Sequence, residues 1–367
     1  MNADGLAGLR LALVGPLPPP AGGMANQMRQ LAELLQGAGA QVELVQTNAA
    51  YRPAWVGTWP GLRAVARLLP YLLTLWRAAG RSQLMHVLAN SGWSWHLFAA
   101  PAVWIARLRG CPVLVNYHGG EAESFLARSL AVVAPSLRRA SLLTVPSAFL
   151  QRVFAGRGFP AQIVPNVVDL SLFRFRAEPG LLQPEAPHLV VLRNLEPVYD
   201  NASALRAFAR VRERWPQARL SIAGSGPELH PLQALAAELG LAQSVTFCGR
   251  LDRQGIAALL ARADLSLNPS LADNMPVSVL ESLASGVPVV STRVGGIPDL
   301  LTPGESALLV PPSDPEALAE AAACLIEDAA LRQRLREGGH AVVAACTWTA
   351  VAPRLLGCYQ QAMAAGR

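Results

Sequence analysis

The sequence predicts an α/β protein of two domains, each a parallel sheet with helices on both faces. Its 367 residues exceed the roughly 250–300 at which a single hydrophobic core stops growing. Short apolar runs alternate with amphipathic helical stretches, and after a break at 174–188 the same alternation begins again. Short buried strands separated by helices are typical of doubly wound parallel sheets.

In the first half, a strand at 9–14 leads to a helix at about 25–36 and then to a second strand, which is how a doubly wound sheet begins. The expected strands are 9–14, 42–46, 84–88, 113–117, 142–145 and 162–164. The stretch 174–188 is rich in Pro and Glu and interrupts the pattern. We therefore expect a first domain over 1–173 and a linker over 174–188.

The second half repeats the alternation and ends in one more helix. The expected strands are 189–192, 220–223, 245–247, 265–268 and 287–291, and the expected helices are 202–214, 227–239, 253–262 and 276–285. These elements predict a second domain over 189–345. Within the remaining 346–367, the amphipathic stretch 348–365 is expected to form a helix that could pack back on the first domain.

Charge is unevenly distributed along the chain. All 31 basic residues are arginine, which excludes Schiff-base chemistry and lysine-based phosphate loops. Residues 1–173 hold 14 Arg and 6 acidic residues, net +8, whereas residues 174–367 hold 17 Arg and 19 acidic residues, net −2. The arginines are not set in a base-reading motif, so nucleic acid is not the expected partner. An anionic membrane surface is the better candidate.

The stretch 61–81 has the composition of an interfacial helix. Its apolar residues include Leu68, Leu69, Leu72, Leu73, Leu75 and Trp76. At 3.6 residues per turn its four arginines fall on one face. They are Arg63, Arg67, Arg77 and Arg81. Because Pro70 can kink the helix and change the phase between the arginine pairs, two interpretations stay open: docking on an anionic membrane, or a packed helix with solvated arginines.

Cysteine usage and hydropathy favour a cytoplasmic protein, peripheral at most to the inner face of the plasma membrane. The five cysteines are odd in number and form no CxxC pair, so neither a disulfide framework nor a zinc cage is expected. No uninterrupted run of about 18 apolar residues marks a membrane span. The apolar run 9–14 is too short for an export signal and lacks its cleavage site.

Two glycine turns stand where a doubly wound sheet presents loops to a ligand. Gly22 and Gly23 precede the first helix, whose N-terminus favours anions. Gly224 and Gly226 follow a strand and resemble a phosphate-binding turn without the full P-loop pattern. Glycine turns join strands to helices in many proteins, so neither turn is specific alone.

His118 directly follows the expected strand 113–117 and precedes two glycines. This places it at the carboxyl edge of the first sheet, where the open backbone favours contact with a ligand over a purely structural role. The other five histidines lack such a setting.

The strongest local signal is the segment 268–281, which closes a strand, turns and opens a helix. Backbone N–H groups at a helix start can hold a diphosphate, and carboxylates, which only accept hydrogen bonds, suit sugar hydroxyls. Asp273 could instead be an N-cap. That alternative leaves Glu281 unexplained in an otherwise apolar helix.

Taken in order, these motifs resemble those of the retaining glycosyltransferases of family four, which have the GT-B fold. The resemblance is carried by Gly22-Gly23-Met24, His118-Gly119, Val164 to Asp169 with Phe173, Gly224 to Pro227, Phe247 to Arg250, Asp273 to Glu281, and Gly286 to Val290 with Gly295-Gly296. It spans nearly the whole chain. It implies two Rossmann-like domains whose parallel sheets face each other across a cleft that binds the donor.

The resemblance also implies roles for single residues. Glu281 matches the glutamate that hydrogen-bonds the donor ribose, and Asp273 matches the acidic residue, usually Glu, that holds hydroxyls of the donor sugar. His118 matches a residue that approaches this sugar, and Arg250 one that lies near the base. Because Asp is shorter than Glu, the sugar contact is expected to be shifted, or to be made instead by backbone groups of Asn274, Met275 and Pro276. Val277 is a further donor-binding candidate.

A second departure concerns the diphosphate. Members of this family generally carry an Arg and a Lys after the first strand of the C-terminal domain. Here Arg193 can be the first cation, but Tyr199 or Asp200 stands where Lys is expected. The leaving group is therefore expected to be stabilised by Arg193 and the helix start near Pro276, with a further arginine as an option. The arrangement resembles members associated with bacterial polysaccharide assembly.

The expected function is transfer of a sugar, of the hexosyl type, from a nucleoside diphosphate donor to a saccharide or lipid-linked acceptor, with retention at the anomeric carbon. No Asp-x-Asp pair offers a site for a bridging ion, so neither a metal nor another cofactor is expected. Two alternatives stay open: a sugar-nucleotide epimerase of the same fold, and a catalytically silent relative that binds sugar or nucleotide as a scaffold. A dinucleotide-dependent dehydrogenase is disfavoured, because the first strand leads into Gly15-Pro16 and not into a GxGxxG turn.

Overall fold

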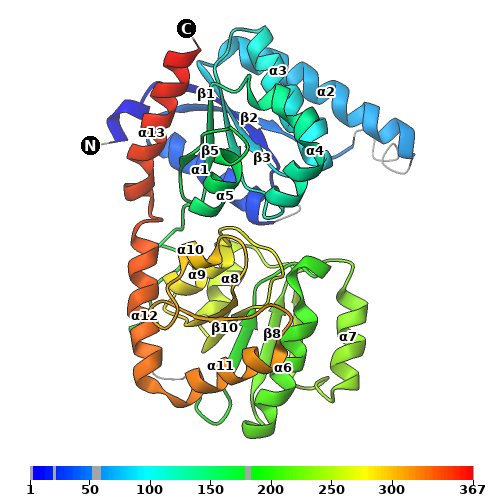
Figure 1. Ribbon diagram of the computed structural model, residues 1–367, viewed down its shortest axis with the longest axis vertical. Helices are drawn as coiled ribbons and strands as arrows, with labels where there is room; N and C mark the ends of the chain where they lie inside the picture. The colour runs from blue at the N-terminus through cyan, green and yellow to red at the C-terminus, as the bar shows by residue number, and fades with distance from the viewer. Residues whose placement is uncertain (1–2, 20–21, 52–58, 178–182, 367) are drawn as a thin grey trace. The chain divides into compact units, whose positions relative to one another are not determined.

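The computed structural model describes residues 3–19, 22–51, 59–177 and 183–366 as an α/β chain of two compact units (Figure 1). The first unit comprises Met1–Val167 with Trp348–Arg367, and the second comprises Val168–Thr347. Each unit is built on one six-stranded sheet. The predicted α/β class with two parallel sheets is confirmed.

In the first unit the strand order is β2-β1-β3-β4-β5-β6, and every neighbouring pair is parallel. The strands are β1 Arg10–Gly15, β2 Gln41–Gln46, β3 Leu84–Ala89, β4 Val113–Tyr117, β5 Leu142–Val145 and β6 Gln162–Ile163. Each lies within one residue of a predicted strand. Strands β1, β3, β4 and β5 are mostly buried runs of four to six residues, as expected for a sheet covered on both faces, and this explains the agreement for them.

Helices cover both faces of this sheet because alternate side chains of each strand point to opposite faces. Ala12 and Val14 belong to a core shared with α2, α3, α4 and α5, whereas Leu11 and Leu13 belong to a core shared with α1 and α13. The helices are α1 Gly23–Gly37, α2 Pro60–Arg81, α3 Ala100–Leu108, α4 Ala122–Leu137, α5 Ala148–Ala155 and α13 Trp348–Ala365, with short helices η1 Ala3–Leu6 and η3 Trp95–Ala99. The last helix of the chain thus completes the first unit.

In the second unit the strand order is β12-β11-β10-β7-β8-β9, again with parallel neighbours. The strands are β7 His188–Val191, β8 Arg219–Ala223, β9 Val245–Gly249, β10 Leu265–Asn268, β11 Val289–Thr292 and β12 Leu308–Val310. The chain starts in the middle of the sheet at β7, runs outward through β8 and β9, and then crosses back to β10. The order therefore reverses between β7 and β10, and this is where doubly wound sheets bind ligands.

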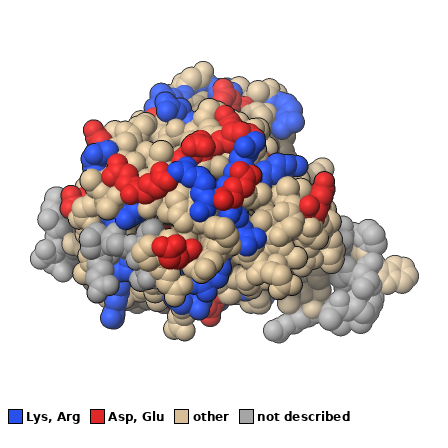
Figure 2. Space-filling model, turned by 90° about the horizontal axis from the view of Figure 1, so that it is seen from below, with Lys and Arg blue, Asp and Glu red and all other residues tan. Residues whose placement is uncertain are grey.

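The helices of the second unit are α6 Asn201–Arg214, α7 Leu229–Glu238, α8 Arg253–Leu260, α9 Val277–Ala284, α10 Ile297–Leu300, α11 Pro315–Glu327 and α12 Ala329–Ala344, with the short helix η4 Pro197–Tyr199. Basic and acidic side chains are interspersed over the face seen in Figure 2. Ion pairs between Arg210 and Glu316 and between Arg214 and Glu327 join α6 to α11. This mixed surface agrees with the near-neutral charge of the second half.

The chain passes between the two units at Val167–Val168 and again at Thr347–Trp348. The stretch 174–188, predicted as a linker, belongs with the second unit where the structure describes it. The backbone N–H of Arg176 donates to Ser285 O (3.2 Å), and its guanidinium donates to Ala263 O (3.0 Å). The units therefore divide before this stretch and not within it.

One helical stretch, Ala329–Ala365, is long and apolar enough by length and composition to cross a membrane. It consists of α12 and α13. Leu335 and Val343 of α12 are buried in cores of the second unit, and Leu355 and Tyr359 of α13 are buried in the first. Part of this stretch is therefore buried by packing inside the two units.

Candidate functional site

The central strands of the second sheet deliver three loops to one edge. Because β10, β7 and β8 are parallel neighbours, their carboxyl ends lie side by side. The loop 192–196 follows β7, the loop 224–228 follows β8, and the loop 269–276 follows β10. Most of the residues predicted for the donor site stand on these loops.

Arg193, on the loop after β7, is held by four groups. Its Nε and Nη2 donate to Ser270 Oγ (3.2 Å each), its Nη1 donates to Ser278 Oγ (3.2 Å), and Nη2 also forms an ion pair with Asp273. The guanidinium carbon lies 4.5 Å from the centre of the Tyr199 ring. The side chain is 11% exposed, and burial lowers its pKa to about 10. Arg193 therefore stays charged at neutral pH in a site that is largely out of water.

Asp273 is fixed from both sides. Its Oδ1 accepts from the Asn274 backbone N–H (2.9 Å), and its Oδ2 accepts from Ser270 Oγ (3.3 Å) as well as from Arg193. The turn needs Gly295, since a Cβ there would meet Asp273 O at 1.9 Å. Sequence reasoning assigned Arg193 and Asp273 to different parts of the donor, and the structure brings the two together as a pair.

Helix α9 begins at Val277 beside this pair. Its N-cap is Pro276, which has no side-chain cap hydrogen bond. Ser278, in the first turn, accepts from Arg193. The positive end of the helix dipole and the guanidinium are therefore neighbours, which makes this corner of the second unit suited to an anion.

Glu281 lies on α9 and is 6% exposed. Burial raises its pKa to about 8, and Arg253 opposes part of this shift. Arg253 itself pairs with Asp169 (Nη2 to Oδ2, 3.2 Å). Near neutral pH the carboxyl of Glu281 is consequently mostly protonated in the absence of a ligand, and hydroxyl groups that donate to it would favour its charged form. A hydrogen-bonding ligand would find it already desolvated.

The glycines after β8 are required by packing. A Cβ on Gly224 would meet Arg193 O at 2.0 Å, and a Cβ on Gly226 would meet Leu195 O at 2.1 Å. They let the loop after β8 lie directly on the loop that carries Arg193. Arg250, after β9, donates from Nε and Nη2 to Ser225 Oγ (3.1 and 2.8 Å) and stays exposed.

The remaining candidates lie in the first unit. His118 follows β4 and is half-buried. Its Nε2 is buried with no hydrogen-bond partner among the described residues, and burial lowers its pKa to about 4. Gly22 is the N-cap of α1, and neither Gly22 nor Gly23 has an atom within 4 Å of where a Cβ would be. Packing within the described residues therefore does not require glycine at these two positions.

Sequence reasoning missed the residues that hold Arg193 in place. Ser270 and Ser278 stood within the singled-out segment 268–281, but two serines in a loop and a helix carry no pattern of their own. Tyr199 was noted only because it stands where a lysine was expected. In the structure these three side chains orient the guanidinium.

In the ranges that the structure describes, no group of three or more His, Cys, Asp or Glu residues could hold a metal ion. None of the five cysteines forms a disulfide. Beside Asp273, the groups suited to a diphosphate are the Arg193 guanidinium and the start of α9.

Two family models match the chain one after the other. The model described as Glycosyltransferase Family 4 matches residues 21–172, and the model described as Glycosyl transferases group 1 matches residues 175–342. The first range falls mainly in the first unit and the second falls in the second unit.

Similar proteins of known name match over most of their length. The chain is 28% identical over 354 residues to a GDP-mannose-dependent alpha-(1-6)-phosphatidylinositol monomannoside mannosyltransferase of Mycolicibacterium smegmatis, covering 87% of this chain and 89% of the relative. It is 29% identical over 395 residues to a D-inositol 3-phosphate glycosyltransferase of Segniliparus rotundus, covering 94% and 86%.

Solved structures show the same fold. The sucrose-phosphate synthase of Thermosynechococcus elongatus matches with a TM-score of 0.77 at 22% identity, covering 97% of this chain and 100% of that one. Anabaena HepE in complex with UDP matches with a TM-score of 0.71 at 17% identity, covering 95% and 99%. Each likeness extends over almost the whole of both chains.

The raised pKa of Glu281 predicts a pH-dependent stability difference. A carboxyl with a pKa of about 8 in the folded protein and about 4.3 in the unfolded chain contributes stability at low pH that is lost as the pH rises toward 8. Between about pH 4.5 and pH 8 the wild type should therefore lose stability relative to Glu281→Gln, with a slope approaching about 1.4 kcal/mol per pH unit. Equilibrium urea unfolding across this range measures the difference.

The matched control is Glu320→Gln on α11, because Glu320 is exposed on the same helix. This variant should follow the wild type at every pH. A constant difference between wild type and Glu281→Gln across the range would show that Glu281 titrates normally.

Proposed function

Because the chain belongs to the glycosyltransferases of the GT-B fold, we propose that it transfers a sugar from a nucleoside diphosphate donor to a saccharide or lipid-linked acceptor, with retention at the anomeric carbon. The observation that carries this proposal is the Arg193–Asp273 pair at the switch point of the second sheet, beside the start of α9 and near the buried Glu281. The cation and the helix start there suit the diphosphate of a sugar nucleotide, and the carboxylates suit its hydroxyl groups. An epimerase would need a set of acids and bases at the anomeric carbon, for which the described residues give no support.

In this proposal Arg193 meets the diphosphate. An arriving diphosphate carries more negative charge than Asp273 and competes with it for the guanidinium. Exchange of partners would free the Asp273 carboxylate to accept from hydroxyls of the donor sugar, with Asn274 to Val277 beside it. The leaving diphosphate is then stabilised by groups already in place, which is the largest contribution that a preorganised site makes to catalysis.

The missing lysine is consistent with this arrangement. Tyr199 lies against the face of the Arg193 guanidinium, and Asp200 caps α6 by accepting from the Ser203 backbone N–H (3.3 Å) and hydroxyl (2.7 Å). The two residues at the lysine position thus orient the remaining cation and begin the next helix. We assign diphosphate neutralisation to Arg193 and the start of α9, with no metal or other cofactor.

Glu281 is proposed to accept from the ribose hydroxyls, and Arg250 to lie near the base. His118 is proposed to contact the donor sugar through a neutral imidazole, because its low pKa excludes a charged ring at neutral pH. Gly22 and Gly23, whose Cβ positions have no described atom within 4 Å, would let a ligand approach the backbone at the start of α1.

Names of similar proteins support the substrate classes. One relative is named as using GDP-mannose and a phosphatidylinositol mannoside, and HepE is described in complexes with UDP and with UDP-glucose. We propose a hexosyl nucleotide as donor and a polysaccharide or glycolipid precursor as acceptor. We propose that the reaction takes place in the cytoplasm, which a sugar-nucleotide donor and cysteines without disulfides support.

We also propose that the first unit docks on an anionic membrane through α2. The helix runs unbroken through Pro70. Its apolar residues divide between two faces: Leu75 is buried, whereas Leu69 and Leu73 are 57% and 59% exposed and Trp76 is 46% exposed. These three outward residues follow the i, i+4, i+7 spacing of one helix face. An exposed apolar face on a basic unit fits an anionic bilayer surface.

The four arginines of this helix are not equivalent in the structure. Arg77 is exposed, Arg67 lies 4.2 Å from the centre of the Tyr51 ring, and Arg81 pairs with Glu43 (2.6 Å). Arg63 falls outside the side chains that the structure describes. Arg109, at the end of α3, lies 4.8 Å from the Trp76 ring and adds a further positive charge beside this face.

Substitution of the two carboxylates tests the donor site. Glu281→Ala should lower kcat/KM by roughly 100-fold or more, because a carboxylate that accepts from two hydroxyls loses two charge-assisted hydrogen bonds of about 1.5–3 kcal/mol each. Asp273→Ala should also lower turnover strongly, whereas Asp273→Glu should be tolerated. Release of nucleoside diphosphate in the presence of acceptor measures all three, with Glu316→Ala as the exposed control. Near-wild-type turnover of Glu281→Ala would remove Glu281 from the site.

Chelation separates protein cations from metal ions. Activity should survive EDTA, whereas Arg193→Ala should lower kcat by about 100- to 1,000-fold, the loss typical of removing one preorganised donor to a developing negative charge. Arg193→Lys should recover part of the activity, because it keeps the charge but not the planar donors. Activity that returns only after Mg²⁺ or Mn²⁺ is added would contradict this assignment.

Vesicle sedimentation tests the membrane proposal. Replacing Arg63, Arg67, Arg77 and Arg81 with Gln should strongly reduce binding to phosphatidylglycerol vesicles at low salt, since each arginine near an anionic surface contributes about 1 kcal/mol. Leu69→Ser with Leu73→Ser should weaken the binding that persists at high salt. The control replaces Arg206, Arg210, Arg212 and Arg214 of α6 with Gln and has the same net charge as the first variant. If both fourfold variants bind alike, α2 is not the docking face.

A further inference from the structure

A small, partly open pocket in the first unit is lined by residues that carry three buried polar atoms without hydrogen-bond partners among the described residues. It measures about 30 Å³ and lies between the sheet, the segment 164–167 and α13. His86 Nε2, Asn116 Oδ1 and His118 Nε2 are buried and have no hydrogen-bond partner in the described part of the chain. All three residues line the cavity. Leaving a buried polar atom unpaired costs about 1–3 kcal/mol, so three in one place call for a common partner.

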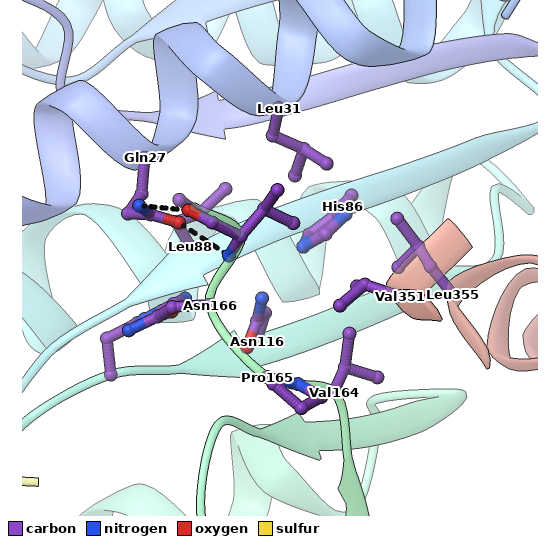
Figure 3. Close-up of a pocket in the computed structure, with 12 residues that line it drawn as sticks. Gln27, Leu31, His86, Leu88, Asn116, Val164, Pro165, Asn166, Val351 and Leu355 are labelled. Atoms are coloured by element: carbon purple, nitrogen blue, oxygen red, sulfur yellow. Dashed lines mark hydrogen bonds between the residues drawn. The ribbon is translucent and has the colours of Figure 1, made fainter. Parts of the chain in front are cut away.

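The sheet explains why these atoms meet. His86 stands on β3 and Asn116 on β4, and the two strands are paired in parallel with Leu88 opposite Asn116. Residues two apart on a strand face the same side, so His86, Leu88 and Asn116 point to one face. Figure 3 shows His86 and Asn116 entering this space from neighbouring strands, with Val351 and Leu355 of α13 beside it. The segment 164–167 is held by Gln27 of α1. The Gln27 amide donates to Val167 O (3.0 Å) and accepts from the Val167 backbone N–H (3.2 Å).

Tyr359 of α13 determines where the proton of His86 sits. Its hydroxyl lies 2.9 Å from His86 Nδ1. Tyr359 is fully buried, and burial raises the pKa of its phenol far above the ordinary value, so the hydroxyl keeps its proton. Among the described residues His86 is its hydrogen-bond partner, so the proton is satisfied only if the hydroxyl donates to Nδ1. His86, which burial keeps neutral, then carries its own proton on Nε2, pointing into the cavity.

We propose that one buried water joins these groups and that Tyr359, His86 and Asn116 act through it as positioning residues for His118. The water accepts from His86 Nε2–H and donates to Asn116 Oδ1 and to His118 Nε2. Three hydrogen bonds are the usual number for a buried water, and a cavity of about 10–15 Å³ is enough to hold one. All three unpaired atoms are satisfied at once. The two imidazoles are not joined by a third His, Cys, Asp or Glu that could complete a metal site among the described residues.

The consequence is a defined tautomer for His118. Since Nε2 accepts from the water, the ring proton is on Nδ1. Nδ1 is not among the buried unpartnered atoms, and His118 is only half-buried. His118 therefore presents an N–H donor to a ligand and not an acceptor. That this ligand is the donor sugar rests on the proposed function; the tautomer itself does not.

Nitrogen-15 NMR of histidine-labelled protein tests the tautomers without any substrate. His86→Gln and His118→Gln assign the signals. We expect His86 to be protonated on Nε2 and His118 on Nδ1 in the wild type. Tyr359→Phe removes only the hydroxyl, so it should release His86 into a mixture of tautomers and move the His118 ring signals with it. Tyr71→Phe is the matched control, because Tyr71 is also buried and its hydroxyl donates to Phe98 O (2.8 Å) in the core on the other face of the sheet.

A His118 signal protonated on Nε2 in the wild type would overturn the proposal, as would His118 signals that stay the same in Tyr359→Phe. These NMR measurements need neither a sugar donor nor an acceptor substrate. They therefore remain decisive if the proposed transfer reaction is wrong.

Where transfer is measurable, a double-mutant cycle gives a second test. Tyr359→Phe should lower kcat about tenfold with little change in the acceptor KM, since it alters one hydrogen bond through His118. In a His118→Ala background the same change should have no further effect. An equal tenfold loss in both backgrounds would mean that Tyr359 acts through stability and not through His118.

Discussion

The buried guanidinium of Arg193 is the group on which the candidate site of the second unit depends. A guanidinium cannot lose its proton at physiological pH, so a fold that buries it must surround it with acceptors. Asp273, Ser270 and Ser278 supply them. The loop after β10 must therefore return to the end of β7. Gly295 and Gly224 leave the room that these backbones need, since a Cβ at either position would overlap a carbonyl oxygen.

Burial acts differently on the two ends of this site. Arg193 has a pKa lowered to about 10 and stays charged, whereas Glu281 has a pKa raised to about 8 and is mostly protonated near neutral pH before a ligand binds. Both groups are largely desolvated before any ligand arrives. Electrostatic interactions in such a setting are stronger than in water, and no solvent has to be reorganised when charge develops. A site of this kind favours a leaving diphosphate over a neutral group.

The first unit also buries polar side chains, but these are uncharged. Its sheet buries His86, Asn116 and part of His118 on the face that α1 and α13 cover. Burial keeps both imidazoles uncharged, so their hydrogen bonds are set by tautomers and not by charge. Because α13 supplies Tyr359, the end of the chain takes part in that choice. The return of the last helix to the first unit is thus more than additional packing.

The sequence by itself determined the sheets and the composition of the site. Strands such as Val113–Tyr117 and Leu265–Asn268 were predictable because short apolar runs between helices have one stable solution in an α/β fold, and Glu281 stood out because a carboxylate breaks the apolar face of α9. The pairing of Arg193 with Asp273 was not predictable, since 80 positions separate the two residues and only the strand order β10-β7 brings them together. The same holds for Ser278 and Tyr359. The local sequence pattern indicates which residues are buried. The partner of a buried polar group depends on which strands and helices become neighbours, and the tertiary structure alone decides that.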